Sequence, residues 1–436
     1  MICLTAFLCE SCVPPPAIPS GDSPIEAHNP LHGQPTIQAW SKKNPVQLAV
    51  DTGATQAAIF FSPTVKNLGG RLRGKAPMQV TNLPISLTKE GPRLEEQTEV
   101  ATVASAPYDG LLGWGTIQKF VWHLNIPKQH HDFYVSLPNQ VKKWKKLPIV
   151  SNPHYLQLLN PNGELTLVDT GAPHTVYIAR SKWESFKADY PDAFISIYSG
   201  YSPAAGGNYA YECMHIQSFR IGSLQLRNVI VCESFVDKKL MGIDRDIDVM
   251  LGLDAFKEHS FWIDPKGKAL YFKKVAQIEN HSPSYNLVGA AFIPSPDGNQ
   301  PLTAKVATWS PAWHAGLRTG DILVGINGRL SPNDSLIEYV TTQEGARATV
   351  SFRRKGQIYT TKWVVPERPP AGEFHPTPLA VSAEEYQRLQ QEEQVKQVEA
   401  QTLPPNIPTD NSSLTPPLPS PQGEPYQRHT PIPSNL

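Results

Sequence analysis

The sequence predicts a mainly β protein in which two similar lobes are followed by a smaller β domain with two helices. The tetrapeptide Asp-Thr-Gly-Ala occurs twice, beginning at Asp51 and at Asp169, and each copy follows an apolar run typical of a strand. Further along the chain, residues 310–328 combine a short helical pattern with closely spaced glycine turns. With 436 residues the chain is long enough for about three domains.

The first two predicted lobes are residues 36–140 and 147–276. The two tetrapeptides lie roughly 120 residues apart, which is the size of a domain. In each half a second apolar run ends in a glycine, Gly113 or Gly252, and a short helical stretch and a closing strand follow. Glycine at such a position leaves room for another strand to cross closely. The sequence therefore predicts one architecture repeated in two lobes.

The two tetrapeptides are the candidate chemical site. Gly53 and Gly171 lack a Cβ atom, so the chain can turn sharply after each strand. The hydroxyl groups of Thr52 and Thr170 are short enough to bond the backbone of the opposite loop. Two carboxylates held face to face can share one proton and activate a water without a metal or a covalent intermediate.

On these residues the chain resembles the aspartic peptidase superfamily, which includes pepsin-like and retropepsin-like enzymes. Residues 219–229 and 248–264 most resemble the bacterial aspartyl proteases that carry a PDZ domain. The resemblance implies a pair of acid-protease barrels and an aspartic endopeptidase whose catalytic residues are Asp51 and Asp169. The alanine after each glycine is more like the retropepsin side of the superfamily.

Several alternatives stay open at this point. The protease fold is expected to be active, but an inactive peptide-binding scaffold is the alternative. Each lobe could pair with its counterpart in another chain, yet two lobes on one chain favour a monomeric active site. Residues 198–209 are glycine-rich with aromatic flanks and are either a hairpin that covers the substrate or a plain surface hairpin.

Residues 284–366 form the third predicted domain. The stretch 310–328 contains Ser-Pro-Ala, Ala-Gly-Leu, Gly-Asp and Ile-Asn-Gly, and it resembles the PDZ domains of bacterial envelope proteases. Pro311 suits the first turn of a helix, and Gly316 suits its C-terminal end. Asn327-Gly328 is typical of a tight turn. A helix is expected over 335–342, and two strands over 348–365.

PDZ domains bind extended peptides along a sheet edge and often hold a terminal carboxylate with backbone amides. The apolar, glycine-bearing stretch at the start of this domain, Leu287-Val288-Gly289-Ala290, is the candidate loop for a peptide C-terminus. The alternative is a structural PDZ domain that packs on the protease lobes. The expected partners are thus a polypeptide substrate and, at the PDZ domain, a peptide terminus.

Composition excludes some functions and leaves others open. The 39 basic and 39 acidic residues give no net charge, which offers no electrostatic case for nucleic acid. No apolar run reaches the roughly 20 residues of a membrane span. We expect residues 1–35 to be a signal remnant or tether, and residues 367–436 to be a disordered Pro/Gln-rich tail. The expected location is the cell envelope or periplasm, lipid-anchored or secreted, with the cytoplasm as the alternative.

No cofactor or metal is expected from the sequence. The histidines show no zinc-type spacing with cysteine, and the adjacent pair His130-His131 is expected in a polar loop. Cys213 and Cys232 lie in the same lobe, where they either pair in an oxidising compartment or remain small buried apolar groups.

Overall fold

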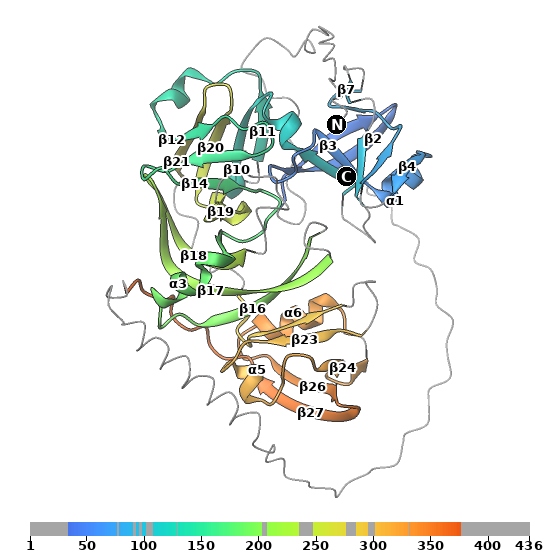
Figure 1. Ribbon diagram of the computed structural model, residues 1–436, viewed down its shortest axis with the longest axis vertical. Helices are drawn as coiled ribbons and strands as arrows, with labels where there is room; N and C mark the ends of the chain where they lie inside the picture. The colour runs from blue at the N-terminus through green and yellow to red at the C-terminus, as the bar shows by residue number, and fades with distance from the viewer. Residues whose placement is uncertain are drawn as a thin grey trace, which may run out of the picture. The chain divides into compact units, whose positions relative to one another are not determined.

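The computed structural model describes residues 34–75, 78–89, 93–95, 98–101, 108–128, 130–202, 207–234, 247–275, 285–294, 301–330 and 332–375. The predicted N-terminal tether and C-terminal tail lie almost wholly outside these residues. Strands dominate the described chain and form three sheets (Figure 1), which confirms the mainly β class. None of the described helices is long and apolar enough to cross a bilayer.

The first sheet has nine strands in the order β4-β5-β8-β3-β9-β2-β1-β6-β7. Strand β2 is central because alternate side chains, Val46, Leu48 and Val50, are buried in the core. The elements are β1 (Thr36–Ser41), β2 (Asn44–Asp51), β3 (Ala58–Phe61), α1 (Ser62–Asn67), β4 (Leu72–Lys75), β5 (Met78–Thr81), β6 (Ile85–Ser86), β7 (Arg93–Glu95), β8 (Thr98–Ala101), β9 (Gly110–Gly113) and α2 (Trp114–Ile117).

The second sheet has twelve strands in the order β11-β10-β20-β21-β12-β13-β14-β19-β15-β18-β17-β16. Its elements are β10 (Val121–Asn125), η1 (Ile126–Lys128), β11 (His130–Tyr134), η2 (Asn139–Lys143), β12 (Lys145–Val150), β13 (Leu156–Leu159), β14 (Leu165–Val168), β15 (Val176–Ala179), α3 (Arg180–Ala188), β16 (Ile195–Ser202), β17 (Gly207–Ile221), β18 (Leu224–Ser234), β19 (Val249–Leu251), η3 (Leu253–Phe256), β20 (His259–Asp264) and β21 (Ala269–Lys274).

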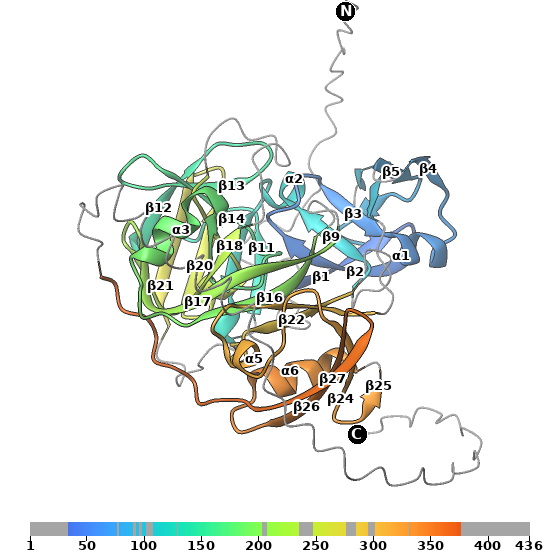
Figure 2. The same cartoon turned by 60° about the horizontal axis from the view of Figure 1, so that its bottom comes forward.

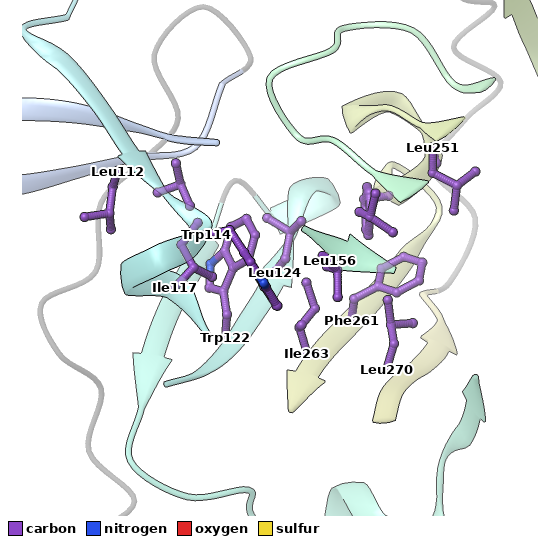
Figure 3. Close-up of a cluster of buried hydrophobic side chains, with 14 of the residues drawn as sticks. Leu112, Trp114, Ile117, Trp122, Leu124, Leu156, Leu251, Phe261, Ile263 and Leu270 are labelled. Carbon is purple, nitrogen blue, oxygen red and sulfur yellow. The ribbon is translucent and has the colours of Figure 1, made fainter. Parts of the chain in front are cut away.

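The two halves of the chain are joined through this second sheet. Strand β10 comes from the span predicted for the first lobe, yet it pairs with β20, where Trp122 lies opposite Ile263. One continuous hydrophobic core includes residues of both halves, such as Trp114 and Leu124 from the first and Leu156 from the second (Figure 3). Backbone hydrogen bonds and shared apolar burial therefore hold the halves together.

Strand β11 corrects one sequence prediction. His130 and His131 begin this strand and do not lie in a polar loop. His131, Asp132 and Phe133 are each 1–2% exposed, so both faces of β11 are covered at the centre of the strand. The pair was misread because two adjacent histidines gave no visible apolar alternation.

The same strand arrangement occurs once in each half. In the first half β2 runs parallel to β9, β9 antiparallel to β3, and β3 parallel to β8. In the second half β14, β19, β15 and β18 repeat these relations in the same order. A Cβ added at Gly113 would lie 2.1 Å from the Gln56 carbonyl oxygen, and one at Gly252 would lie 2.1 Å from that of His174. The backbone close to each glycine therefore belongs to the loop after the aspartate, and not to a crossing strand as the sequence suggested.

The third sheet follows the order β22-β23-β24-β26-β27, with β25 paired to β24. Figure 2 shows α5 and α6 beside these strands. Ser310 caps α5 by accepting a hydrogen bond from the Trp313 amide, with Pro311 in the first turn as expected. The elements are β22 (Ala290–Ile293), β23 (Thr303–Val306), α5 (Pro311–His314), β24 (Ile322–Ile326), β25 (Arg329–Leu330), α6 (Asp334–Thr342), β26 (Arg347–Arg354) and β27 (Gln357–Val364).

Candidate functional site

The two aspartates occupy equivalent places in the two halves. Asp51 is the last residue of β2 and lies opposite Gly113 on the neighbouring strand. Asp169 directly follows β14, and its amide donates to the Leu251 carbonyl at 2.8 Å on the corresponding neighbour. The residues before them, Val50 and Val168, are fully buried. The burial of β2 and β14 therefore fixes the positions of Asp51 and Asp169 at the ends of these strands.

The structure brings the two carboxyl groups into contact. The two side chains lie within hydrogen-bonding reach of each other, and each affects the pKa of the other. Each carboxyl also lies against the glycine of the opposite loop. A Cβ added at Gly53 would be 2.4 Å from the Asp169 Cγ, and one at Gly171 would be 2.7 Å from the Asp51 Cγ. Glycine is thus required at both positions for the carboxyls to meet.

Backbone amides hold each carboxyl in place. Gly53 donates to Asp51 Oδ1 at 2.8 Å, and Gly171 donates to Asp169 Oδ1 at 2.9 Å. Burial raises the pKa of Asp51, although these amide bonds oppose the shift. Burial, and then the charge of Asp51, raise the pKa of Asp169 well above its ordinary value. Both shifts favour the protonated form, so the pair holds a proton more readily than an isolated aspartate does.

Two threonines cross-link the loops, as the sequence suggested. The Thr52 hydroxyl donates to the Val168 carbonyl at 2.8 Å and accepts from the Thr170 amide at 3.0 Å. The Thr170 hydroxyl donates to the Val50 carbonyl at 2.9 Å and accepts from the Thr52 amide at 3.1 Å. Both threonines are fully buried. Four reciprocal bonds therefore fix one loop against the other.

Three tyrosines lie near enough to the pair to respond to its charge, and one of them, Tyr209, belongs to the hairpin expected over residues 198–209. The charge of Asp51 adds to burial in raising the pKa of Tyr108, and that of Asp169 does the same for Tyr155 and Tyr209. Tyr108 and Tyr155 belong to no motif in the sequence, because they approach the carboxyls from segments distant along the chain. They provide a partly desolvated, aromatic surround for the two carboxyls.

Strands β16 and β17 form the hairpin expected over residues 198–209, whose tip at 203–206 lies outside the described residues. The Tyr198 ring lies 4.8 Å from that of His174, five residues after Asp169. His174 Nε2 is 3.0 Å from the Tyr211 hydroxyl, and burial lowers the pKa of this histidine to about 4. The base of the hairpin is therefore connected to the Asp169 loop.

Cys213 of β17 forms a disulfide with Cys232 of β18.

The predicted PDZ loop, Leu287 to Ala290, is buried, with Leu287 and Val288 fully so. Its amides have partners within the chain. The Asn286 side chain accepts hydrogen bonds from Val288 at 3.1 Å and Gly289 at 2.9 Å. The Leu287 amide donates to the Thr341 carbonyl of α6 at 2.8 Å. An oxygen of this chain thus stands where a peptide carboxylate would accept the same bonds.

Asn286 also ties this loop to the hairpin. Its amide donates to the Tyr198 hydroxyl at 2.7 Å, and its carbonyl accepts from the Ser196 hydroxyl at 2.6 Å. Its side-chain nitrogen donates to the Ile197 carbonyl at 3.0 Å. Asn286 is 6% exposed, so these bonds are shielded from water. No motif marked Asn286 in the sequence, because its role depends on a strand distant along the chain.

Comparison with known protein families matches residues 303–354 to the PDZ domain. The match covers β23 to β26 with both helices, so this part of the chain is a PDZ domain, a module that docks peptides. No curated protein matches the chain.

Proposed function

We propose that this chain is an aspartic endopeptidase in which Asp51 and Asp169 activate a water between them. The observation that carries the proposal is the contact of the two carboxyls on equivalent, cross-linked loops. Two half-buried carboxyls in contact repel each other unless a proton is shared between them. Such an arrangement has a direct chemical use, since it presents an acid and a base at one point.

In the proposed reaction the ionised carboxylate removes a proton from the water as the water oxygen bonds to the peptide carbonyl carbon. The protonated carboxyl donates its proton to the carbonyl oxygen, which gives a neutral tetrahedral diol. The C–N bond of the diol then breaks, and the leaving amine takes one proton from the carboxyl pair. One hydroxyl of the diol gives its proton back to the pair as the product carbonyl forms. The pair ends with one proton, as it began, so neither Asp51 nor Asp169 needs a fixed role.

The repeated strand arrangement supports the likeness to two-lobed acid proteases suggested by the sequence. Both carboxyls come from one polypeptide, which supports a monomeric active site. The tyrosine-flanked hairpin of β16 and β17 is the proposed cover for a bound substrate. The charge of Asp169 contributes to the raised pKa of Tyr209, so this part of the hairpin lies near the carboxyl pair. The disulfide favours an oxidising location such as the cell envelope.

We further propose that peptide binding at the PDZ domain controls whether this hairpin is held in place or released. Asn286 holds the hairpin through Ser196, Ile197 and Tyr198 while it occupies the loop amides. A peptide terminus that took the amides of Val288 and Gly289 would have to displace the Asn286 side chain. Peptide docking and release of the hairpin would then be linked.

The function is tested by incubating the purified full chain with a mixture of denatured proteins from acidic to neutral pH. New peptide termini are identified by mass spectrometry. We expect cleavage by the wild type and by the Asp334→Asn control, which changes an exposed aspartate of the PDZ domain. Cleavage should be lost in Asp51→Asn and in Asp169→Asn. A wild type that cleaves nothing while remaining folded would instead indicate a peptide-binding scaffold, and unchanged cleavage by either variant would refute the proposed dyad.

A further inference from the structure

A second group of chemically reactive side chains lies on strands β10 and β11, apart from the aspartate pair. In this antiparallel pair His123 lies opposite Asp132, and His130 is two residues before Asp132 on the same face. One potential ligand atom from each of these three residues lies within 4.8 Å of the other two. Two imidazoles and a carboxylate are a ligand combination that zinc accepts.

Asp132 is incompletely satisfied where it stands. Its side chain is 1% exposed, and its Oδ2 contacts His130 Nε2 at 2.5 Å and accepts from the Tyr134 hydroxyl at 3.3 Å. Its Oδ1 is also buried and has no hydrogen-bond partner among the described residues. A buried carboxylate oxygen without a partner is unfavourable, and a cation would offset this cost.

His123 is held in a fixed orientation at the same place. Its ring stacks on Trp262 with centroids 4.3 Å apart and an angle of 10° between the planes. Its Nε2 lies 2.8 Å from the Ser260 Oγ. Such restraint by neighbouring groups is usual for metal-binding histidines.

The group also has access to solvent. His123 lines a cleft of about 420 Å³ together with Lys128, Lys273 and Lys274, and the His130 side chain is 43% exposed. The lysines oppose a bare cation, but they would attract an anion that fills a remaining coordination position. This arrangement suits a three-residue site with one open position.

We propose that His123, His130 and Asp132 bind one divalent transition-metal ion of the zinc class. Zinc bonds of about 2.0–2.2 Å in tetrahedral geometry set neighbouring ligand atoms roughly 3.3–3.5 Å apart. Binding would therefore separate the His130–Asp132 contact by about 1 Å and give each group a bond to the ion. The shift is within the reach of side-chain rotation.

The position indicates a structural role for this ion. His123 belongs to β10 in the first half of the chain, whereas its partners Ser260 and Trp262 belong to β20 in the second half. An ion bound here would brace β10 and β11 where the halves are joined. A second group, His174 with Cys213 and Cys232, does not compete for this role, since its cysteines form a disulfide.

The test uses the purified full chain after chelator treatment and dialysis. Co²⁺ is added and its visible absorption is recorded, then Zn²⁺ is added to displace it. We expect about one equivalent of Co²⁺ in a tetrahedral or five-coordinate spectrum, and a melting temperature raised by a few degrees in Zn²⁺. His130→Gln changes a side chain that is 43% exposed, and it should weaken binding at least about tenfold, as should His123→Gln.

His154→Gln is the matched control, because His154 is exposed and outside the group. It should bind Co²⁺ like the wild type. The proposal is overturned if the wild type gives no saturable Co²⁺ spectrum, or if His130→Gln and His123→Gln bind as tightly as the control. Neither result depends on proteolysis, so the metal site and the proposed peptidase activity are tested separately.

Discussion

Replacing Thr52 with valine will loosen the cross-link between the two aspartate loops. Valine keeps the shape of threonine but loses the bonds to the Val168 carbonyl and the Thr170 amide, at 2.8 and 3.0 Å. Thr52 and Thr170 are both fully buried, so water cannot replace these bonds. At about 1–3 kcal/mol for each group left unsatisfied, we expect a loss of about 2–6 kcal/mol in the free energy of unfolding.

The assay is urea unfolding followed by tryptophan fluorescence, with the slope of the transition compared between variants. Thr170→Val should have a similar effect, since its hydroxyl makes the reciprocal pair of bonds. The double variant should lose less than the sum of the two single losses, because the loops will already have separated.

Thr116→Val is the control for burial alone. Thr116 is also fully buried, but its hydroxyl has no hydrogen-bond partner among the described residues. Removing it should change the free energy of unfolding by less than about 0.5 kcal/mol, or should stabilise the protein. Equal losses in Thr52→Val and Thr116→Val would refute the claim that the cross-link, rather than packing, stabilises the loops.

Three further predictions concern the pair and its hairpin. Gly171→Ala places a Cβ 2.7 Å from the Asp51 carboxyl, which must move by up to about 1 Å, so peptide cleavage should fall about 100-fold while circular dichroism stays unchanged. The pKa of Asp169 is raised in the folded state, so wild-type stability should fall above pH 3.8, by up to about 1.4 kcal/mol per pH unit until the folded pKa is passed. The stability of Asp169→Asn should not show this pH dependence. The prediction is contradicted if the free energies of unfolding of the wild type and of Asp169→Asn change by the same amount between pH 4 and 7. Tyr198→Phe removes the acceptor of the Asn286 amide, so hydrogen exchange at that amide should quicken about tenfold, whereas an unchanged rate would show that the contact does not restrain the loop.

The repeated tetrapeptide predicted much of the site, since its parts act locally. The sequence shows a threonine and then a glycine after each aspartate, and the structure places these residues as expected. It also shows a distant glycine in each half, where the backbone comes close. The caps and turns of the PDZ domain were predictable for the same reason. Asn327 and Gly328 both have positive φ, as a tight turn requires.

The features that were missed depend on contacts between segments distant in the sequence. Tyr108 and Tyr155 approach the carboxyls from two segments that carry no motif. Asn286 satisfies the PDZ loop amides only because β16 lies beside it. Strand register places His123 opposite Asp132, which no spacing rule for metal ligands would detect. The sequence left open whether Cys213 and Cys232 pair, and the register of β17 and β18 decides for the disulfide.

The central claim is that Asp51 and Asp169 act as one acid–base unit, and carboxyl titration tests it most directly. The chain is labelled with ¹³C at the aspartate carboxyls and followed by NMR as the pH is raised, with Asp51→Asn and Asp169→Asn used to assign the signals. We predict that both signals respond together in two steps, that one proton is retained well above pH 3.8, and that either substitution alters the titration of the remaining partner. Two independent titrations near pH 3.8, each unaffected by loss of the other residue, would contradict the account.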